Sequence, residues 1–172
     1  MNAINDRVRE VYVLGLRNQH AVEHQAIELL ERQIGRLENC PEMEARMRQH
    51  LEESREQAHR IEELLTGLGS SHSSVKDTVM SLVGNMLAIG HAPAGDEVIK
   101  NTIANFAFEH YEIAAYKSLL TLADTVGHAP AKAALSTSLK EEESMATWID
   151  SHIAATTMRF VERSAAGEKA KA

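Results

Sequence analysis

Three glutamates fall on helix faces that the sequence otherwise fills with apolar residues. Glu23, Glu109 and Glu142 each lie near the middle of a segment in which apolar residues recur every three or four positions. An ionised carboxylate in a protein core costs several kcal/mol unless a counter-charge pairs with it. Arginine and lysine are nearly absent from these faces. The pattern therefore indicates carboxylates that share a counter-charge, and divalent metal ions are its simplest source.

Two further glutamates border the same faces. Glu53 flanks the apolar stripe of its segment, and Glu112 lies one helical turn from Glu109. The five carboxylates carry five negative charges, which two divalent ions would nearly balance. Oxygen ligands favour hard or borderline ions, so we expect two divalent ions, with iron as the leading candidate and Mn, Mg or Ca as alternatives.

The elements that carry these residues are predicted by the positions of glycine and proline. No segment alternates with the period of two that is typical of strands. Four long helices are expected, and a connection of about 30 residues between the second and third carries a short extra helix. The expected long helices cover residues 4–38, 41–65, 96–126 and 130–163, and the short helix covers 74–90.

This order of short, long and short connections predicts the fold class. It is typical of an all-α, ferritin-like antiparallel four-helix bundle, whose middle connection crosses the length of the bundle. We expect one domain over residues 1–163 and a flexible tail over 164–172. The faces expected to meet in the core include Ser54 in the second helix, Ile103 in the third and Ala146 in the fourth.

Composition restricts the classes of function. A net charge of −7 and 4% aromatic residues argue against a nucleic-acid or anionic-membrane binder. No apolar run reaches the length of a membrane span, and the first residues do not resemble a signal peptide. The single cysteine, Cys40, fits a reducing compartment. We therefore expect a cytoplasmic protein with no nucleic-acid or membrane partner.

Several residues with suitable chemistry are better explained as surface or packing residues. Glu56 and His59 have Glu-x-x-His spacing but face away from the stripe of the second helix, so we expect both in solvent. Glu141 and Glu143, which flank Glu142, are also expected in solvent. His20, in the first stripe, is expected to be a hydrogen-bonded core residue.

Four segments resemble the YciE/YciF-type ferritin-like stress proteins of bacteria. They are AVEHQAIELLERQ (21–33), QHLEESREQ (49–57), FEHYEIAAYKSLLTLA (108–123) and LKEEES (139–144). The resemblance extends from about residue 8 to residue 153. It implies a four-helix domain related in plan to rubrerythrin, association with stress responses, a homodimer, and a carboxylate-rich metal site.

The resemblance also assigns residues to that site. Its metal-binding glutamates correspond to Glu23, Glu53, Glu109, Glu112 and Glu142 of this chain. The chain departs from the family pattern in having Gln57 where relatives often carry His, and Ala146 where they carry an acid. These departures leave open whether the second metal site is intact.

Three classes of function follow from these observations, the third being a bundle that binds a small apolar ligand. In the first, a di-iron centre binds O₂ or peroxide and oxidises Fe²⁺, with His50, Gln57 and Tyr116 as neighbours that orient the ligands. In the second, the bundle is a non-enzymatic structural or stress-interaction protein whose metal site is vestigial or only stabilising. Whether the chain is an enzyme at all is left open by the sequence.

Overall fold

The protein is a bundle of long helices in the computed structural model, which describes residues 3–71 and 96–168. These residues form α1 (Ala3–Ile34), α2 (Pro41–Gly67), α4 (Glu97–Thr125) and α5 (Ala129–Ala165), with no strand among them. The predicted all-α bundle of four long helices is confirmed. The short helix expected over 74–90 lies outside the described residues.

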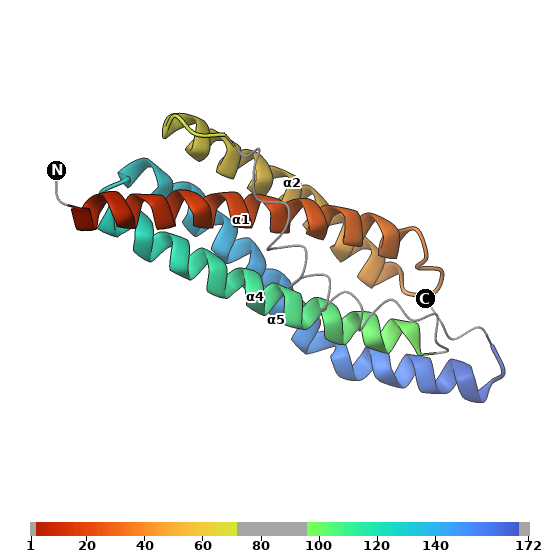
Figure 1. Ribbon diagram of the computed structural model, residues 1–172. Coiled ribbons are helices and arrows are strands. Elements are labelled where there is room, and N and C mark those ends of the chain that lie inside the picture. The colour runs from red at the N-terminus through yellow and green to blue at the C-terminus, as the bar shows by residue number, and fades with distance from the viewer. Residues whose placement is uncertain (1–2, 72–95, 169–172) are drawn as a thin grey trace.

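Each helix packs antiparallel on two neighbours (Figure 1). α1 packs on α2 and α4, and α5 packs on α4 and α2. α2 ends at the opposite end of the bundle from the start of α4. This arrangement brings the midpoints of all four helices together. Within the described residues, no helix combines the length and apolar character that crossing a lipid bilayer requires.

The core has a polar middle between two apolar clusters. One cluster contains Leu16, Ile61 and Leu135, and the other contains Leu30, Met47 and Ile149. On α1, Glu23 lies between the residues that belong to the two clusters. The clusters supply the burial that holds the helices together and leave a water-poor layer at mid-length.

Helix ends follow the predicted boundaries to within a few residues. α1 ends at Ile34 rather than at residue 38, because Arg36 and Leu37 donate to carbonyls three residues back and tighten the last turn. α2 continues to Gly67. Gly69, at a φ of 69°, closes α2 as the amides of Gly69 and Ser70 bond the last carbonyls.

The buried face of α4 differs from the predicted one near its start. Ile103 was expected in the core, yet 56% of its surface is exposed. Asn105 is buried instead, because its amide exchanges two hydrogen bonds with that of Gln33 on α1, at 3.0 and 2.8 Å. A reciprocal amide pair can replace apolar contact at a helix interface because it satisfies both buried polar groups.

Gly127 is expected to be required for the α4–α5 turn. Its φ of +70° is a left-handed conformation, so Gly127→Ala should lower the free energy of unfolding by about 1 kcal/mol. The matched control is Gly67→Ala, at a helical position with open space around its Cβ, which should leave stability unchanged or raise it by about 0.5 kcal/mol. Urea unfolding measures both, and equal effects would contradict the assignment.

Candidate metal centre

Four glutamate side chains meet in the polar middle layer of the bundle. Glu23 comes from α1, Glu109 and Glu112 from α4, and Glu142 from α5, and each is at most 3% exposed. α4 supplies two of them because residues three apart lie on neighbouring positions of one helix face. Carboxyl groups this deep in a bundle require hydrogen bonds, protons or cations to offset their loss of hydration.

His50, from α2, contacts this group of carboxyls directly. Its Nε2 lies 3.1 Å from Oε2 of Glu109 and 3.7 Å from Oε2 of Glu142. The contact with Glu109 lacks the geometry of a hydrogen bond and is electrostatic. The three residues offer ligand atoms that all lie within 4.8 Å of one another. One nitrogen and two carboxylate oxygens are a suitable donor set for a borderline divalent ion.

Glu53 holds His50 in this orientation. Its Oε2 lies 2.9 Å from Nδ1 of His50 and 3.1 Å from a guanidinium nitrogen of Arg46, and Gln49 donates to its other oxygen at 2.7 Å. A carboxylate on one imidazole nitrogen fixes the tautomer and aims the other nitrogen, as it does behind many metal-bound histidines. Glu53 thus lies behind His50, and it is His50 that contacts the other carboxyls, in the role that the family resemblance implied for Glu53.

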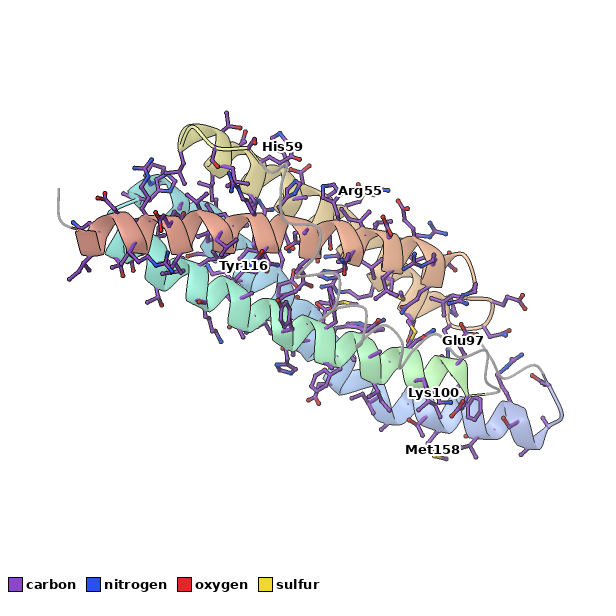
Figure 2. All side chains as sticks on the ribbon, viewed as in Figure 1. Arg55, His59, Glu97, Lys100, Tyr116 and Met158 are labelled. Carbon is purple, nitrogen blue, oxygen red and sulfur yellow. The ribbon has the colours of Figure 1, made fainter. Side chains whose placement is uncertain are left out.

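Glu23 and Glu112 are joined through neutral donors. The Gln19 amide donates to Oε1 of Glu23 at 2.9 Å and to Oε1 of Glu112 at 3.2 Å. The Tyr116 hydroxyl donates to the same Glu23 oxygen at 2.5 Å, and Figure 2 shows Tyr116 pointing inward. These contacts leave other oxygens of the layer without a donor.

The unpartnered oxygens are the feature of this layer that hydrogen bonding leaves unexplained. Oε2 of Glu23, Oε2 of Glu109 and both oxygens of Glu142 are buried without a hydrogen-bond partner among the described residues. Buried acceptors of this kind are rare in native proteins, and an ion is one recognised reason for them. The residues present therefore fit a bound cation.

Burial and mutual repulsion favour the protonated forms of Glu23, Glu112 and Glu142 when no cation is present. Loss of hydration raises the pKa of Glu23 to about 7 in spite of its bonds from Tyr116 and Gln19. Burial, with the neighbouring carboxylates, also raises the pKa values of Glu112 and Glu142 well above their usual range. Burial alone would lower the pKa of His50, but the surrounding carboxylates outweigh it and raise that pKa.

The remaining site candidates lie at the edge of this layer. Gln57 is fully buried, but its amide donates outward to Glu141 at 3.0 Å. The prediction that Glu141 is solvated was wrong, because it is partly buried and pairs with Arg60 at 2.8 Å. Ala146 is buried and supplies no ligand. His59, like Glu56, is exposed as expected, on the outer face of α2 (Figure 2).

The sequence matches one protein family over nearly its whole length. Residues 7–162 match the family described as a domain of unknown function, DUF892. The chain belongs to this family. It is 29% identical to the protein YciF of Escherichia coli K12 over 147 residues, which are 79% of this chain and 84% of YciF. The expected YciF-type relationship is confirmed.

Solved structures share the fold of this DUF892 protein. A protein of Xanthomonas campestris pv. campestris aligns with a TM-score of 0.77 at 29% identity, over 91% of this chain and 98% of that one. YcfI of Rhodopseudomonas palustris aligns with 0.73 at 26%, over 83% and 92%. The Escherichia coli stress protein YciF aligns with 0.74 at 22%, over 85% and 94%. All four chains are thus built on one helical plan.

The metal-free protein should lose stability as pH rises. A carboxyl whose pKa is raised on folding binds more protons folded than unfolded, so its contribution is complete below pH 4.5 and is lost as pH rises through about 7 for Glu23. That loss is about 3 kcal/mol for Glu23 alone. Urea unfolding of metal-stripped protein between pH 5 and 8, with Glu23→Gln as the comparison, measures it.

Below pH 4.5, acid should lower the free energy of unfolding through Glu53. Burial opposes its ionisation, but bonds from His50, Arg46 and Gln49 outweigh this and lower its pKa to about 2, so its contribution is lost only as pH falls below 4.5. For the Glu23 prediction, the contradicting outcome is a free energy of unfolding that stays constant from pH 5 to 8 in both wild type and Glu23→Gln. That outcome would contradict the burial of the glutamate layer.

Proposed function

We propose that this DUF892 protein is a ferritin-like, non-haem di-metal carboxylate protein that binds iron and oxidises Fe²⁺ with O₂ or peroxide. The observation that carries the proposal is the group of four buried glutamates around one histidine, with four carboxylate oxygens left without a donor. Helical bundles with inward glutamates from facing helices are a known plan for such sites. Association with stress responses rests on the resemblance alone.

The two ions would be held by overlapping sets of residues. His50, Glu109 and Glu142 would hold one ion, since their ligand atoms already converge. Glu112 and Glu23 would hold the second, with Glu142 between the two sets, because the carboxyl of Glu142 interacts electrostatically with those of both Glu109 and Glu112. Bound iron would supply the one-electron chemistry that side chains lack.

The chain's own residues set the conditions for that chemistry. Tyr116 and Gln19 hold Glu23 through one oxygen and leave the other directed to the layer. Glu53 accepts a hydrogen bond from Nδ1 of His50. The proton that His50 loses when it binds a metal ion therefore comes from Nε2. The apolar clusters on either side exclude water and strengthen every charge interaction between them.

Metal content tests this proposal most directly. After anaerobic Fe²⁺ loading and desalting, wild-type protein should retain about two Fe per chain by mass spectrometry. Glu142→Gln should lose most of it, because Glu142 serves both sets. The matched control is Glu143→Gln, the next residue on α5, which is exposed and should retain wild-type content. No uptake by the wild type, or equal content in both variants, would remove the proposal.

A non-enzymatic bundle is the second candidate, and His50 is the observation that favours it. Protonated His50 lies within 3.7 Å of both Glu109 and Glu142 and neutralises part of the layer without a metal ion. Ala146, where relatives often carry an acid, also reduces the ligand supply. Iron that binds but is not oxidised faster than free Fe²⁺ would favour this candidate, with metal as a stabiliser only.

We also propose a cytoplasmic homodimer. The dimer rests on the family resemblance, and the reducing compartment on Cys40, a single cysteine that is free in the structure. Light scattering coupled to size exclusion should give twice the mass of one 19.0 kDa chain. A mass of one chain would remove the dimer and leave the metal centre unaffected, since all its residues come from one chain.

A further inference from the structure

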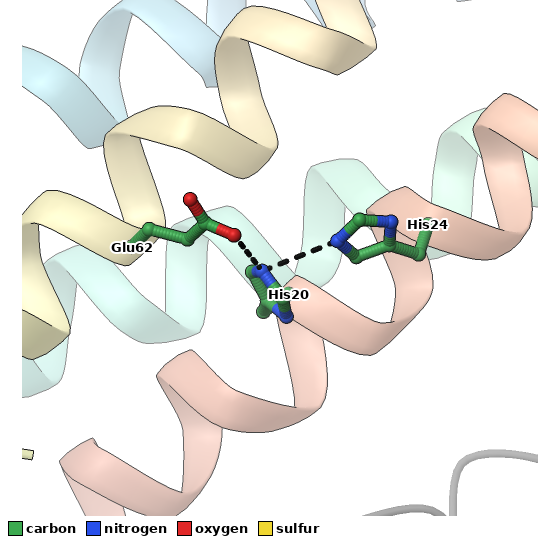
Figure 3. Close-up of side chains that lie close together, drawn as sticks. All are labelled: His20, His24 and Glu62. Atoms are coloured by element: carbon green, nitrogen blue, oxygen red, sulfur yellow. Dashed lines mark hydrogen bonds and ion pairs between the residues drawn. The ribbon is translucent and has the colours of Figure 1, made fainter. Parts of the chain in front are cut away.

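A second group of ligands lies outside the glutamate layer, at the rim between α1 and α2. His20 and His24 are one turn apart on α1, and Glu62 faces them from α2 (Figure 3). Nε2 of His20 lies 2.8 Å from Oε1 of Glu62 and 3.3 Å from Nε2 of His24. We propose that these three residues form a binding site for a borderline divalent cation, of which Zn²⁺ is the best fit.

The ligand spacing fits a tetrahedral ion. Zn–N distances of about 2.0 Å place neighbouring ligand atoms of a tetrahedron about 3.3 Å apart. The two imidazole nitrogens are 3.3 Å apart, and all three ligand atoms lie within 4.8 Å of one another. The shorter contact, between His20 and Glu62, must open by about 0.5 Å. Glu62 can move by this much because its side chain is 41% exposed.

Proton accounting also favours an ion. Nε2 of His20 can carry at most one hydrogen, yet it meets the Glu62 carboxylate and Nε2 of His24 at once. If His20 Nε2 carries that hydrogen, two acceptors must share it. If His24 donates to His20 instead, the lone pair of His20 Nε2 also faces the Glu62 carboxylate, which repels it. A cation accepts the lone pairs of all three groups, so each contact becomes favourable.

The surroundings allow an ion to enter and to complete its coordination with water. His20 is 7% exposed on its side chain and supplies a fixed ligand, whereas His24 is exposed and Glu62 is half-exposed. Two imidazoles and one carboxylate, with a position left for water, form a donor set that binds zinc in proteins. This set is richer in nitrogen than the glutamate layer, so the two sites differ in metal preference.

The site connects two helices and should therefore stabilise their contact. Its ligands come from the middle of α1 and from the last part of α2, so a bound ion would link these two parts of the hairpin. Because the ion binds the folded arrangement and the unfolded chain only weakly, Zn²⁺ should raise the melting temperature. The site uses none of the residues assigned to iron, so it can exist whether or not the proposed function is correct.

The test is Zn²⁺ titration of the full-length Glu142→Gln protein, in which the glutamate layer is impaired. Zinc should bind at one equivalent per chain and shift the imidazole NMR signals of His20 and His24. His24→Ala in this background should weaken zinc binding by at least about tenfold and abolish the rise in melting temperature, because loss of a ligand exceeds loss of an outer partner.

The matched control is His59→Ala, which removes an exposed histidine near a glutamate on α2. It should bind zinc like its parent. His24 is exposed, so its replacement leaves the fold intact, and circular dichroism verifies this. Equal zinc binding by the His24→Ala and His59→Ala proteins, or no zinc uptake by their parent, would overturn the proposal. Loss of iron binding by Glu142→Gln, with zinc binding retained, would separate the two sites.

Discussion

Replacing Glu142 by leucine is expected to stabilise the metal-free protein and to destabilise the metal-loaded protein relative to wild type. Glu142 is fully buried, and neither of its oxygens has a partner among the described residues. Without a cation, an apolar side chain of similar size removes this cost, and the free energy of unfolding should rise by about 1–4 kcal/mol at pH 8. With metal, the same change removes a ligand.

The comparison uses four samples in urea unfolding. Wild type and Glu142→Leu are each measured with chelator and with Mn²⁺, which avoids oxidation. A metal ion at about a thousand times its Kd adds about 4 kcal/mol to the wild type. That gain should be absent from the variant, so that the order of stability reverses. Glu143→Gln should stay within about 0.5 kcal/mol of wild type in both conditions.

A second apolar variant controls for the branched shape of leucine, which differs from that of glutamate. Glu142→Met keeps an unbranched chain of the same length and should behave like Glu142→Leu. If both variants are less stable than wild type in chelator, the Glu142 carboxyl is satisfied without metal, through a proton shared with Glu109. That result would favour the non-enzymatic candidate.

The fold was predictable because its signals are local. Gly127 closes α4 in a left-handed conformation, and Pro41 begins α2, so single residues mark these boundaries. The buried face of α4 was less predictable. Asn105 is buried only because Gln33, on another helix, satisfies its amide, and no property of α4 alone encodes that partner.

The candidate site also contains residues that were predictable from the sequence and one contact that was not. Glu23, Glu109 and Glu142 were predicted because a carboxylate in an apolar stripe is unusual within its own segment. The direct contact of His50 with the carboxyls was not predicted, since it depends on which nitrogen Glu53 binds and on carboxyls from α4 and α5. The signal available in the sequence was the spacing of three between His50 and Glu53, which allows contact on one helix face.

The second large effect is expected on iron oxidation. Glu109→Gln should lower the rate at which O₂ or H₂O₂ oxidises protein-bound Fe²⁺ by at least about a hundredfold. This substitution keeps the size of the side chain but removes the charge that faces Nε2 of His50 at 3.1 Å. Stopped-flow absorbance after anaerobic Fe²⁺ loading measures the rate, and Fe²⁺ at saturating concentration separates weaker binding from slower oxidation.

A graded series makes the assignment of roles falsifiable. Glu53→Gln keeps a side chain against His50 but weakens the orientation of the imidazole. It should lower the affinity for Fe²⁺ about ten- to a hundredfold, which is a smaller loss of affinity than Glu109→Gln should cause. Glu143→Gln should match the wild type. If Glu53→Gln lowers the affinity for Fe²⁺ more than Glu109→Gln does, Glu53 is a ligand and His50 only supports it. If wild type and Glu109→Gln oxidise Fe²⁺ equally fast, the centre does not act as an oxidase, and the bundle's role is structural.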